Sequence, residues 1–388
     1  PDAGSDGSSG SGGAGGTGGS PADGGGAGGS AGSAGADGGG GTTQQPFSCP
    51  GWTRDTTFPP GMDLTGDIWA SSASDVYVAT GTYATGEIAH YDGSNWSLMT
   101  LPVVSGTWAN MNAMWGSSAN DVWAGGGYLP TMGSGRSRLL HRVNQGAWII
   151  DPNFPWSSGE GTVRSIWGAD SSDIFVMVDY YISSKRDVKI YRKSGSSWTS
   201  MTLPSHSPPA HMRQIWGKNA SDVYAVGTQL DAGSNPVKGL LWHYDGNGSW
   251  KDVTTLPADV LTLGGVHGAG NVQVVGSYWD GSNYHGVRLA STDLTSWSRY
   301  NSAMTAYDSA VWSPGQGACL AGGAIPVPPI NGAARLGTMS LGSWSPESQL
   351  DGTAAYVTGI APVTASSQVW LATYGETGFA GAYKGSCQ

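Results

Sequence analysis

Tryptophan recurs at nearly equal intervals through most of this chain. A second motif keeps the same period and reads IWASSASDVYV from Ile68, MWGSSANDVWA from Met114, IWGADSSDIFV from Ile166 and IWGKNASDVYA from Ile215. More divergent copies begin at Val266, Val311 and Gly359. A fixed period filled with short β-type segments is typical of radial or stacked repeats. The periodic tryptophans, 44 to 52 residues apart, are Trp52, Trp96, Trp148, Trp198, Trp250, Trp297 and Trp344.

The repeating unit predicts four short antiparallel strands. In the unit from Asp67 to Pro102, Ile68 and Trp69 end a first strand, and three further segments at 76–80, 87–91 and 96–99 are rich in β-branched and aromatic residues. Asp92-Gly93 supplies a hairpin turn, because glycine tolerates a positive φ. Four antiparallel strands in a radial unit indicate a β-propeller blade. A solenoid, the alternative, would need capping repeats, and the sequence shows none.

The phase of the tryptophans predicts how the ring closes. Trp52 has the pattern of a fourth strand but precedes every first strand, and the last unit ends after a third strand at 378–383. We therefore expect an all-β, seven-bladed propeller over residues 46–388, whose N-terminal strand completes the seventh blade. Cys49 and Cys387 flank this junction and predict a disulfide, although three free thiols are the alternative, since Cys319 stands alone in a second strand.

The first 45 residues differ from the rest in composition. They are dominated by Gly, Ser and Ala, which cannot bury enough apolar surface to offset the entropy of ordering, so we expect a disordered linker over 1–45. The chain begins with Pro1, and a removed signal peptide ending in a lipid-modified cysteine would fit this start. No apolar run is long enough to span a membrane. We expect a secreted, periplasmic or outer-surface protein, with a lipid anchor upstream of Pro1 left open.

The repeats resemble those of a known group of proteins. MWGSSANDVWAGG, IWGKNASDVYAVG and the hairpin HYDGSNW at residues 90–96 are similar to repeats in secreted propeller proteins and lipoproteins of myxobacteria, which usually follow a Gly/Ser-rich stretch. The resemblance covers residues 46–388 and implies a fold without a defined activity. It extends distantly to Asp-box propellers such as sialidases. The segment from Ser291 to Trp297 is one residue short of an Asp-box and lacks its glycine, so sialidase chemistry is not implied.

Charge and motifs exclude several functional classes. Only 12% of the residues are charged and the net charge is −10, whereas binding to nucleic acid needs clustered Lys and Arg. The sequence contains no HExxH, GxSxG, P-loop or CxxC motif, so we expect no cofactor and no metal site, and an enzyme is not favoured. A glycoside hydrolase or polysaccharide lyase using loop carboxylates or histidines is kept as a third alternative.

Repetition separates structural residues from candidate binding residues. One aspartate recurs in the same turn of four units, where a short carboxylate accepts backbone N–H groups as in Asx-turns. Three tryptophans fall outside the repeat: Trp108 and Trp156 lie between units, and Trp279 lies in a second-to-third-strand loop. These two loop classes emerge on one face, and long loops on a rigid scaffold usually carry binding residues. The recurring aspartates are Asp75, Asp121, Asp173 and Asp222.

The same loops gather aromatic and polar side chains, which suit stacking against sugar rings; packing of the loops onto the blades is the alternative. The entry to the central channel is a second candidate site. Arg164 and Arg213 come from successive units and could clamp a carboxylate or sulfate, unless they form internal ion pairs with Asp67 or Asp308. The candidate ligand-binding residues are Trp108, Trp156, Trp279, Tyr128, Tyr180, Tyr284, His285, Arg164, Arg213 and Asn112.

We therefore expect a ligand-recognition propeller that binds polysaccharide or glycoconjugate on its long-loop face. A scaffold for protein–protein interaction is the first alternative.

Overall fold

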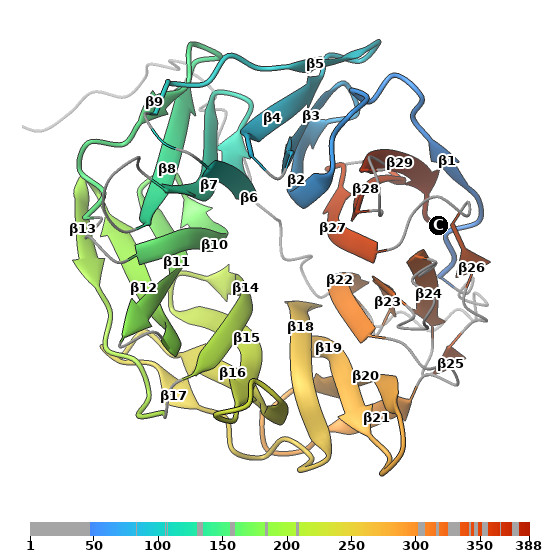
Figure 1. Ribbon diagram of the computed structural model, residues 1–388. Helices are drawn as coiled ribbons and strands as arrows, with labels where there is room; N and C mark the ends of the chain where they lie inside the picture. Colours follow the sequence, from blue (N-terminus) through green and yellow to red (C-terminus); the bar gives the residue numbers. More distant parts are fainter. Residues whose placement is uncertain are drawn as a thin grey trace, which may run out of the picture.

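A computed structural model of the protein describes residues 47–388 with several gaps, which are 83, 105, 107, 130–134, 156–159, 183–184, 207–208, 302–306, 316–317, 325–333, 341–342, 345–347, 351–355, 365 and 375–379. The expected linker over 1–45 lies outside the described residues. The described part is a seven-bladed β-propeller: seven antiparallel sheets stand around a common axis, each with its first strand innermost (Figure 1).

The strands of blades 1 to 4 are β2 (Leu64–Ser72), β3 (Asp75–Gly81), β4 (Gly86–Tyr91) and β5 (Trp96–Leu98); β6 (Trp108–Ser118), β7 (Asp121–Leu129), β8 (Arg136–Val143) and β9 (Ile149–Ile150); β10 (Glu160–Asp170), β11 (Asp173–Ile182), β12 (Lys185–Ser194) and β13 (Ser197–Ser200); and β14 (Ala210–Asn219), β15 (Asp222–Leu230), β16 (Pro236–Tyr244) and β17 (Lys251–Asp252).

The strands of blades 5 to 7 are β18 (Val260–Ala269), β19 (Asn271–Trp279), β20 (Tyr284–Ser291) and β21 (Ser298–Asn301); β22 (Tyr307–Gly315), β23 (Ala318–Ala324), β24 (Ala334–Ser340) and β25 (Ser343–Trp344), with β26 (Ser348–Gln349) also paired to β24; and β27 (Tyr356–Pro362), β28 (Gln368–Tyr374), β29 (Gly381–Ser386) and β1 (Trp52–Arg54).

The ring closes as the sequence predicts. β1 pairs antiparallel with β29, Trp52 lying opposite Gly385, so the N-terminal strand is the outermost strand of blade 7 (Figure 1). Ser48 and Gln388 exchange two backbone hydrogen bonds of 3.0 and 2.8 Å beside this pair. A disulfide between Cys49 and Cys387 joins the two ends across a sequence separation of 338 residues. The expected disulfide is thereby confirmed.

The strands reach further than the sequence suggested. The sequence predicts a long second-to-third loop over 178–189 in blade 3, but β11 continues to Ile182 and β12 begins at Lys185. Cross-strand pairs such as Tyr180 opposite Asp187 extend the ladder into the expected loop, because aromatic residues favour paired strands. Tyr128, Tyr180 and Trp279 are therefore strand residues, and Trp108 begins β6.

The antiparallel order gives the ring two different faces. Turns between first and second strands and between third and fourth strands lie on one face, called here the turn face. Hairpins between second and third strands and the links between blades lie on the other, called the loop face.

Neighbouring blades interlock through the Trp-Gly dipeptide of the first strands. The tryptophan ring of one blade lies on the glycine of the next, so closely that a Cβ on the glycine would come within 2.5 to 2.7 Å of the ring. Only glycine leaves room for this contact. The three pairs are Trp69–Gly116, Trp115–Gly168 and Trp167–Gly217.

Where the tryptophan is missing, the glycine is missing too. Blade 7 has Ala361 at the position of the tryptophan, and blade 1, which follows it in the ring, has Ala70 at the position of the glycine. Blade 5 has His267 at the position of the tryptophan, and blade 6 has Ser313 at the position of the glycine. The backbone N–H of Ser313 donates to His267 Nδ1 at 3.2 Å. Each blade without the tryptophan is thus followed by a blade without the glycine, whereas Trp312 of blade 6 is followed by Pro362 at the glycine position of blade 7.

A second interlock runs along the outer edge. The indole N–H of the outer tryptophan in blades 2, 3 and 4 donates to the residue three positions after the outer tryptophan of the preceding blade. The contacts are Trp148 Nε1 to Met99 Sδ at 3.2 Å, Trp198 Nε1 to Asp151 Oδ2 at 3.0 Å and Trp250 Nε1 to Met201 Sδ at 3.3 Å.

The Trp-Gly contact predicts a coupled stability effect. The added methyl of Gly168→Ala would meet the ring of Trp115, and we expect a loss of ~1–3 kcal/mol in the free energy of unfolding, the usual cost of overpacking. In a Trp115→Ala background the same substitution should cost much less. Denaturant unfolding of the four proteins of this cycle measures the coupling. An equal loss of unfolding free energy in both backgrounds would show that the indole ring of Trp115 is not the reason why position 168 requires glycine.

Candidate functional site

The residues predicted to bind ligand do not all come together. Trp156 lies outside the described residues, and Trp108 begins β6 with a side chain that is not described. Trp279 ends β19 on the loop face and is 40% exposed. Tyr284 and His285 begin the partner strand β20 directly opposite, Tyr284 facing Trp279. These three residues form one cluster in blade 5, while Tyr128 and Tyr180 lie in blades 2 and 3.

The residues expected at the entry to the central channel share one backbone feature. Each first strand contains a β-bulge or register irregularity at nearly the same height. In blade 1 the irregularity covers Gly66 and Asp67. A bulge leaves one residue out of the ladder and redirects its neighbours. The residues left out in blades 2 to 7 are Asn112, Arg164, Arg213, Gly264, Ser309 and Thr358.

Several bulged side chains connect one blade to the next. Asn112 Nδ2 donates to Thr162 Oγ1 of blade 3 at 2.8 Å. Ser309 Oγ donates to the carbonyl oxygen of Val357 in blade 7 at 2.6 Å. Thr358 makes the corresponding hydroxyl contact with blade 1. The bulges therefore form an inner belt of hydrogen bonds between blades, and Asn112 is used in this belt.

Arg164 has an internal partner. Its Nε lies 2.5 Å from Oδ2 of Asp179 on β11 of the same blade, and Asp179 is only 1% exposed. The partner is therefore neither Asp67 nor Asp308, the two carboxylates considered from the sequence, because the long second strand brings Asp179 to this height. A guanidinium already paired with a buried carboxylate is a poor clamp for an external anion. Arg213, from the next blade, is exposed.

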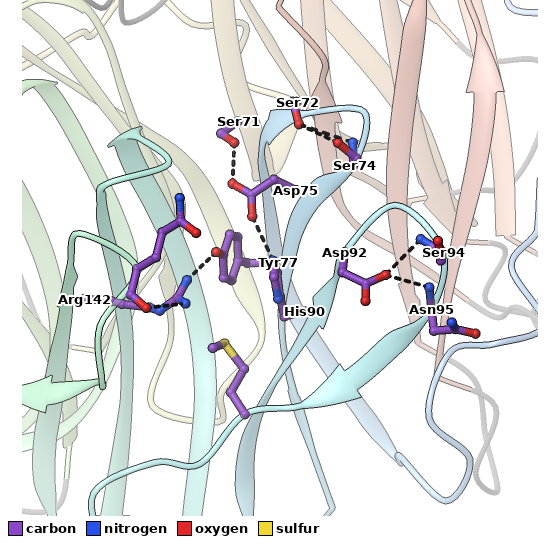
Figure 2. Close-up of polar contacts among 12 residues, drawn as sticks. Ser71, Ser72, Ser74, Asp75, Tyr77, His90, Asp92, Ser94, Asn95 and Arg142 are labelled. Atoms are coloured by element: carbon purple, nitrogen blue, oxygen red, sulfur yellow. Dashed lines mark hydrogen bonds and ion pairs between the residues drawn. The ribbon is translucent and has the colours of Figure 1, made fainter.

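Each recurring aspartate is the centre of a polar network on the turn face, and Figure 2 shows the network of Asp75. Asp75 accepts hydrogen bonds from His90 Nε2, at 2.8 Å, and from the hydroxyl of Ser71. Tyr77 stacks on His90 with ring centroids 4.3 Å apart, and its hydroxyl accepts a hydrogen bond from Arg142 of blade 2. These partners are side chains, so the expectation that Asp75 accepts backbone N–H groups is wrong.

The network recurs with substitutions. Asp121 pairs with His141 at 2.7 Å and with Ser117 at 2.5 Å, and Asp222 pairs with His243 at 2.8 Å. In blade 3 an arginine, Arg192, replaces the histidine and binds Asp173 through two nitrogens. The backbone-capping role belongs instead to residues three positions earlier. These are Ser72, Ser118, Asp170 and Asn219.

Serine, histidine and aspartate thus meet in blades 1 and 2, but their order excludes the geometry of a catalytic triad. A triad needs the serine on the histidine and the histidine on the aspartate, whereas here Asp75 lies between Ser71 and His90. In blade 4, burial opposes ionisation of Asp222, but hydrogen bonds from His243 and Tyr224 and the charge of Lys218 outweigh it and hold the pKa at about 2. These carboxylates act as structural hydrogen-bond acceptors within and between the strands of each blade.

The cluster in blade 5 is built on a tight hairpin. Residues Asp280–Asn283 have the sequence Asp-Gly-Ser-Asn, and Asp280 Oδ1 accepts the backbone N–H groups of Ser282 and Asn283 at 2.8 Å each. Gly281 provides the positive φ of 100° that the turn needs. Oδ2 of Asp280 accepts a hydrogen bond from His285 Nε2 at 2.7 Å. Hydrogen bonds from Asn283, Ser282 and His285 hold the pKa of Asp280 at about 2.

Two aromatic layers extend from this hairpin. On one side Trp279 lies against Tyr284 with ring centroids 4.8 Å apart. On the other side Tyr278 stacks on His285 at 5.2 Å, and the guanidinium of Arg299 covers the ring of Tyr278 at 4.5 Å. Tyr278 and Arg299 were not among the residues predicted from the sequence to bind ligand. Tyr278 could have been found, because pairing outward from the Asp-Gly-Ser-Asn turn places it opposite His285.

Arg299 is itself tightly held. Its two terminal nitrogens bind the two carboxylate oxygens of Asp259 at 2.8 and 2.7 Å, and its Nε donates to Asn301 Oδ1 at 2.7 Å. The hairpin thus carries an exposed indole on one side and a rigid polar network on the other.

A second surface feature lies on the outer rim between blades 1 and 2. A hollow of about 630 Å³ is lined by Met99, Thr100, Leu101, Pro102, Gly146, Ala147, Trp148, Ile149 and Ile150. Ile149 is 52% exposed and Ile150 39%. The residues at the same positions after the outer tryptophan of blade 3 are Thr199 and Ser200, so the fold does not require apolar side chains there. The hollow has no charged residue in its lining.

Comparison with known proteins supports the fold. No family model matches the chain, and no curated protein matches it. The WD40 β-propeller domain of Doa1 is similar in structure, with a TM-score of 0.53 and 11% identity over 86% of this chain and 97% of that one. The β-propeller domain of Cps50 (Swd1) from Myceliophteria thermophila has a TM-score of 0.53 and 10% identity, covering 87% of this chain and 99% of that one.

A chain of the mitotic checkpoint complex gives similar values, a TM-score of 0.53 and 11% identity over 87% of this chain and 94% of that one. At identities this low, the structural similarity shows the β-propeller fold alone, a fold that commonly serves as a scaffold for binding ligands or proteins. The described residues contain no helix long and apolar enough to cross a membrane. They also contain no group of three metal-ligating side chains.

Asp67 makes the stability of the ring depend on pH. Burial raises its pKa from 3.8 to about 7, against the opposing effect of hydrogen bonds from the backbone of Ile68 and Met114. The folded state therefore holds the proton more tightly than the unfolded state does. The stability that this proton contributes is present at low pH and is lost as the pH rises to about 7, at ~1.4 kcal/mol for each unit of pKa shift.

Asp67→Asn should remove this dependence, because the amide keeps an oxygen acceptor and cannot ionise. We expect the variant to be more stable than the wild type at pH 8 and close to it at pH 4.5, measured by urea unfolding. Asp92→Asn is the control, since hydrogen bonds from Asn95 and Ser94 lower the pKa of Asp92 and the sign is opposite. An unchanged difference between wild type and Asp67→Asn at the two pH values would contradict the assignment.

Proposed function

We propose that this protein recognises carbohydrate at the loop-face end of blade 5, with Trp279 as the stacking platform. The observation that carries the proposal is the 40% exposure of an indole fixed on a short hairpin, which also carries Asp280 and His285, two groups that can exchange hydrogen bonds with hydroxyls. Sugar rings present apolar C–H faces to an aromatic ring and hydroxyls to its polar neighbours, so the arrangement matches both halves of the ligand.

Trp279 is better placed for recognition than the other candidate residues on the loop face. Tyr284 lies against its ring, and the turn that follows Trp279 is fixed by a hydrogen bond of 2.7 Å between Asp280 and His285. An aromatic side chain that is already held in place before the ligand binds loses little conformational entropy on binding. Tyr180, by comparison, is covered by Lys189, whose Nζ lies 4.5 Å from the ring centre.

Replacing Trp279 tests the proposal. Trp279→Ala should weaken binding to a glycan array at least about tenfold, while Trp279→Phe should retain part of the affinity because a smaller aromatic face remains. Leu129→Ala is a matched control, since Leu129 ends the second strand of blade 2 and is also 40% exposed. Both sites are on the surface, so the unfolding free energy should stay within about 0.5 kcal/mol of the wild type.

Two results would refute carbohydrate recognition at this site. One is undiminished glycan binding by Trp279→Ala. The other is the absence of binding to any glycan by the wild type.

A protein-interaction scaffold is the second candidate, and the apolar rim hollow favours it. Its size suits a short extended segment with apolar side chains rather than a folded domain, which needs a larger interface. The double substitution Ile149→Thr with Ile150→Ser installs the residues that blade 3 has at these positions. Peptides selected from a display library on the wild type should bind this variant at least about tenfold more weakly in calorimetry. Equal binding to both proteins would exclude the rim.

A further inference from the structure

We infer that Met99 is a site of reversible oxidation by peroxides, and that the fold keeps the outer-edge contact between blades 1 and 2 after this modification. The inference goes beyond ligand recognition and does not depend on it. It follows from the position of Met99 in the rim hollow, and from the atom that accepts the equivalent hydrogen bond between blades 2 and 3.

Met99 lies where the rim hollow meets the outer interlock of the blades. Its side chain lines the hollow and is partly buried, whereas the indole that donates to it, Trp148, is only 4% exposed. Ile149, in the same lining, is 52% exposed, so the hollow is open to solvent. A small oxidant dissolved in water can therefore reach the thioether of Met99.

The sulfur of Met99 already accepts a hydrogen bond. Trp148 Nε1 lies 3.2 Å from Met99 Sδ, and Trp250 Nε1 makes the same contact with Met201 Sδ at 3.3 Å. A thioether sulfur is a weak acceptor. It has two lone pairs, so one remains for reaction while the other faces the indole.

The next interface along the ring has an oxygen in this role. Between blades 2 and 3 the equivalent acceptor is Asp151, whose Oδ2 accepts the indole N–H of Trp198 at 3.0 Å. A sulfoxide carries an oxygen on the sulfur, and the flexible side chain of methionine can turn that oxygen toward the indole. The fold therefore already uses, at one interface, the kind of acceptor that oxidation of Met99 creates at another.

The reaction is the transfer of one oxygen atom. A lone pair of the Met99 sulfur attacks the peroxide, an S–O bond forms and the O–O bond breaks. The proton of the transferred oxygen passes to the departing oxygen, which leaves as water from hydrogen peroxide or as an alcohol from an organic peroxide. Sulfur loses two electrons and the peroxide gains them. Methionine sulfoxide reductases reverse the oxidation.

The modification changes the character of the hollow. Its lining contains no charged residue and is mostly apolar. Oxidation replaces an apolar thioether in this lining by a polar sulfoxide. Met99 thus couples the polarity of the rim hollow to the presence of peroxide.

Peptide mapping by mass spectrometry tests the accessibility of Met99. The full-length protein is treated with hydrogen peroxide, and the sulfoxide fraction of each methionine is followed with time. We expect Met99 to be oxidised at least about tenfold faster than the methionines buried inside the blades. The reductases for the two sulfoxide epimers should then restore it. The buried methionines, between 0 and 2% exposed, are Met111, Met114, Met177 and Met212.

Two results of this mapping would refute the inference. One is oxidation of Met99 no faster than that of the four buried methionines. The other is a sulfoxide at Met99 that the reductases leave in place.

The indole N–H resonance of Trp148 tests whether the contact survives oxidation. Trp148→Phe identifies this resonance in the NMR spectrum of isotope-labelled protein. We expect peroxide to move it downfield, because oxygen is a stronger acceptor than sulfur. Met99→Leu is the matched control, since leucine has a similar volume but neither an acceptor nor an oxidisable sulfur. In this variant the resonance should lie upfield of its wild-type position and should not respond to peroxide.

The same spectra can contradict the inference. An upfield shift of the Trp148 resonance on oxidation would show that the contact is broken. Loss of the native spectrum as the Met99 sulfoxide forms in the wild type, but not in Met99→Leu, would show that the fold does not accept the modification.

Discussion

Circular closure is the constraint on which the rest of this structure depends. Each blade buries its two faces against its neighbours, so an open ring would expose one apolar face at each end. Blade 7 lacks a fourth strand of its own in sequence order, and β1 supplies it beside β29. The Cys49–Cys387 disulfide then holds the junction where the chain provides only three paired residues in β1. In the chain-entropy view, closing so long a loop stabilises the fold by about 5 kcal/mol.

The fold was accessible from the sequence because it depends on local patterns repeated many times. Strand segments, glycine turns and the spare fourth strand around Trp52 are each visible within about ten residues, and repetition confirms the interpretation. The Trp115–Gly168 contact joins residues from two repeats, yet it too leaves a sequence signature, since Ala361 and Ala70 change together. The bulges leave none. They change the backbone register of every first strand while different side chains occupy the extra position.

The candidate site could be predicted only in part, because some of its contacts are not encoded in a local sequence pattern. Trp279 and His285 stand out because they depart from the repeat. Arg299 does not stand out, since its role depends on Asp259, a residue 40 positions earlier in the chain. The predicted partners of Arg164, Asp67 and Asp308, were wrong. Its actual partner, Asp179, belongs to a strand extension that the sequence pattern presented as a loop. In both cases the missing information is a contact between strands whose register at the loop face local propensity does not determine.

Comparison of equivalent side chains in different blades separates buried structural carboxylates from exposed ones. Asp121 and Asp280 are both carboxylates beside a histidine, with nitrogen–oxygen distances of 2.7 Å in each pair. Asp121 is 15% exposed and has Ser117, Trp123 and His141 as donors, so its oxygens are surrounded within the blade. Asp280 is 39% exposed and lies at the tip of the hairpin that carries the exposed indole of Trp279. Pairing with a histidine is therefore common to both carboxylates, and the exposure of Asp280 is what distinguishes it from Asp121.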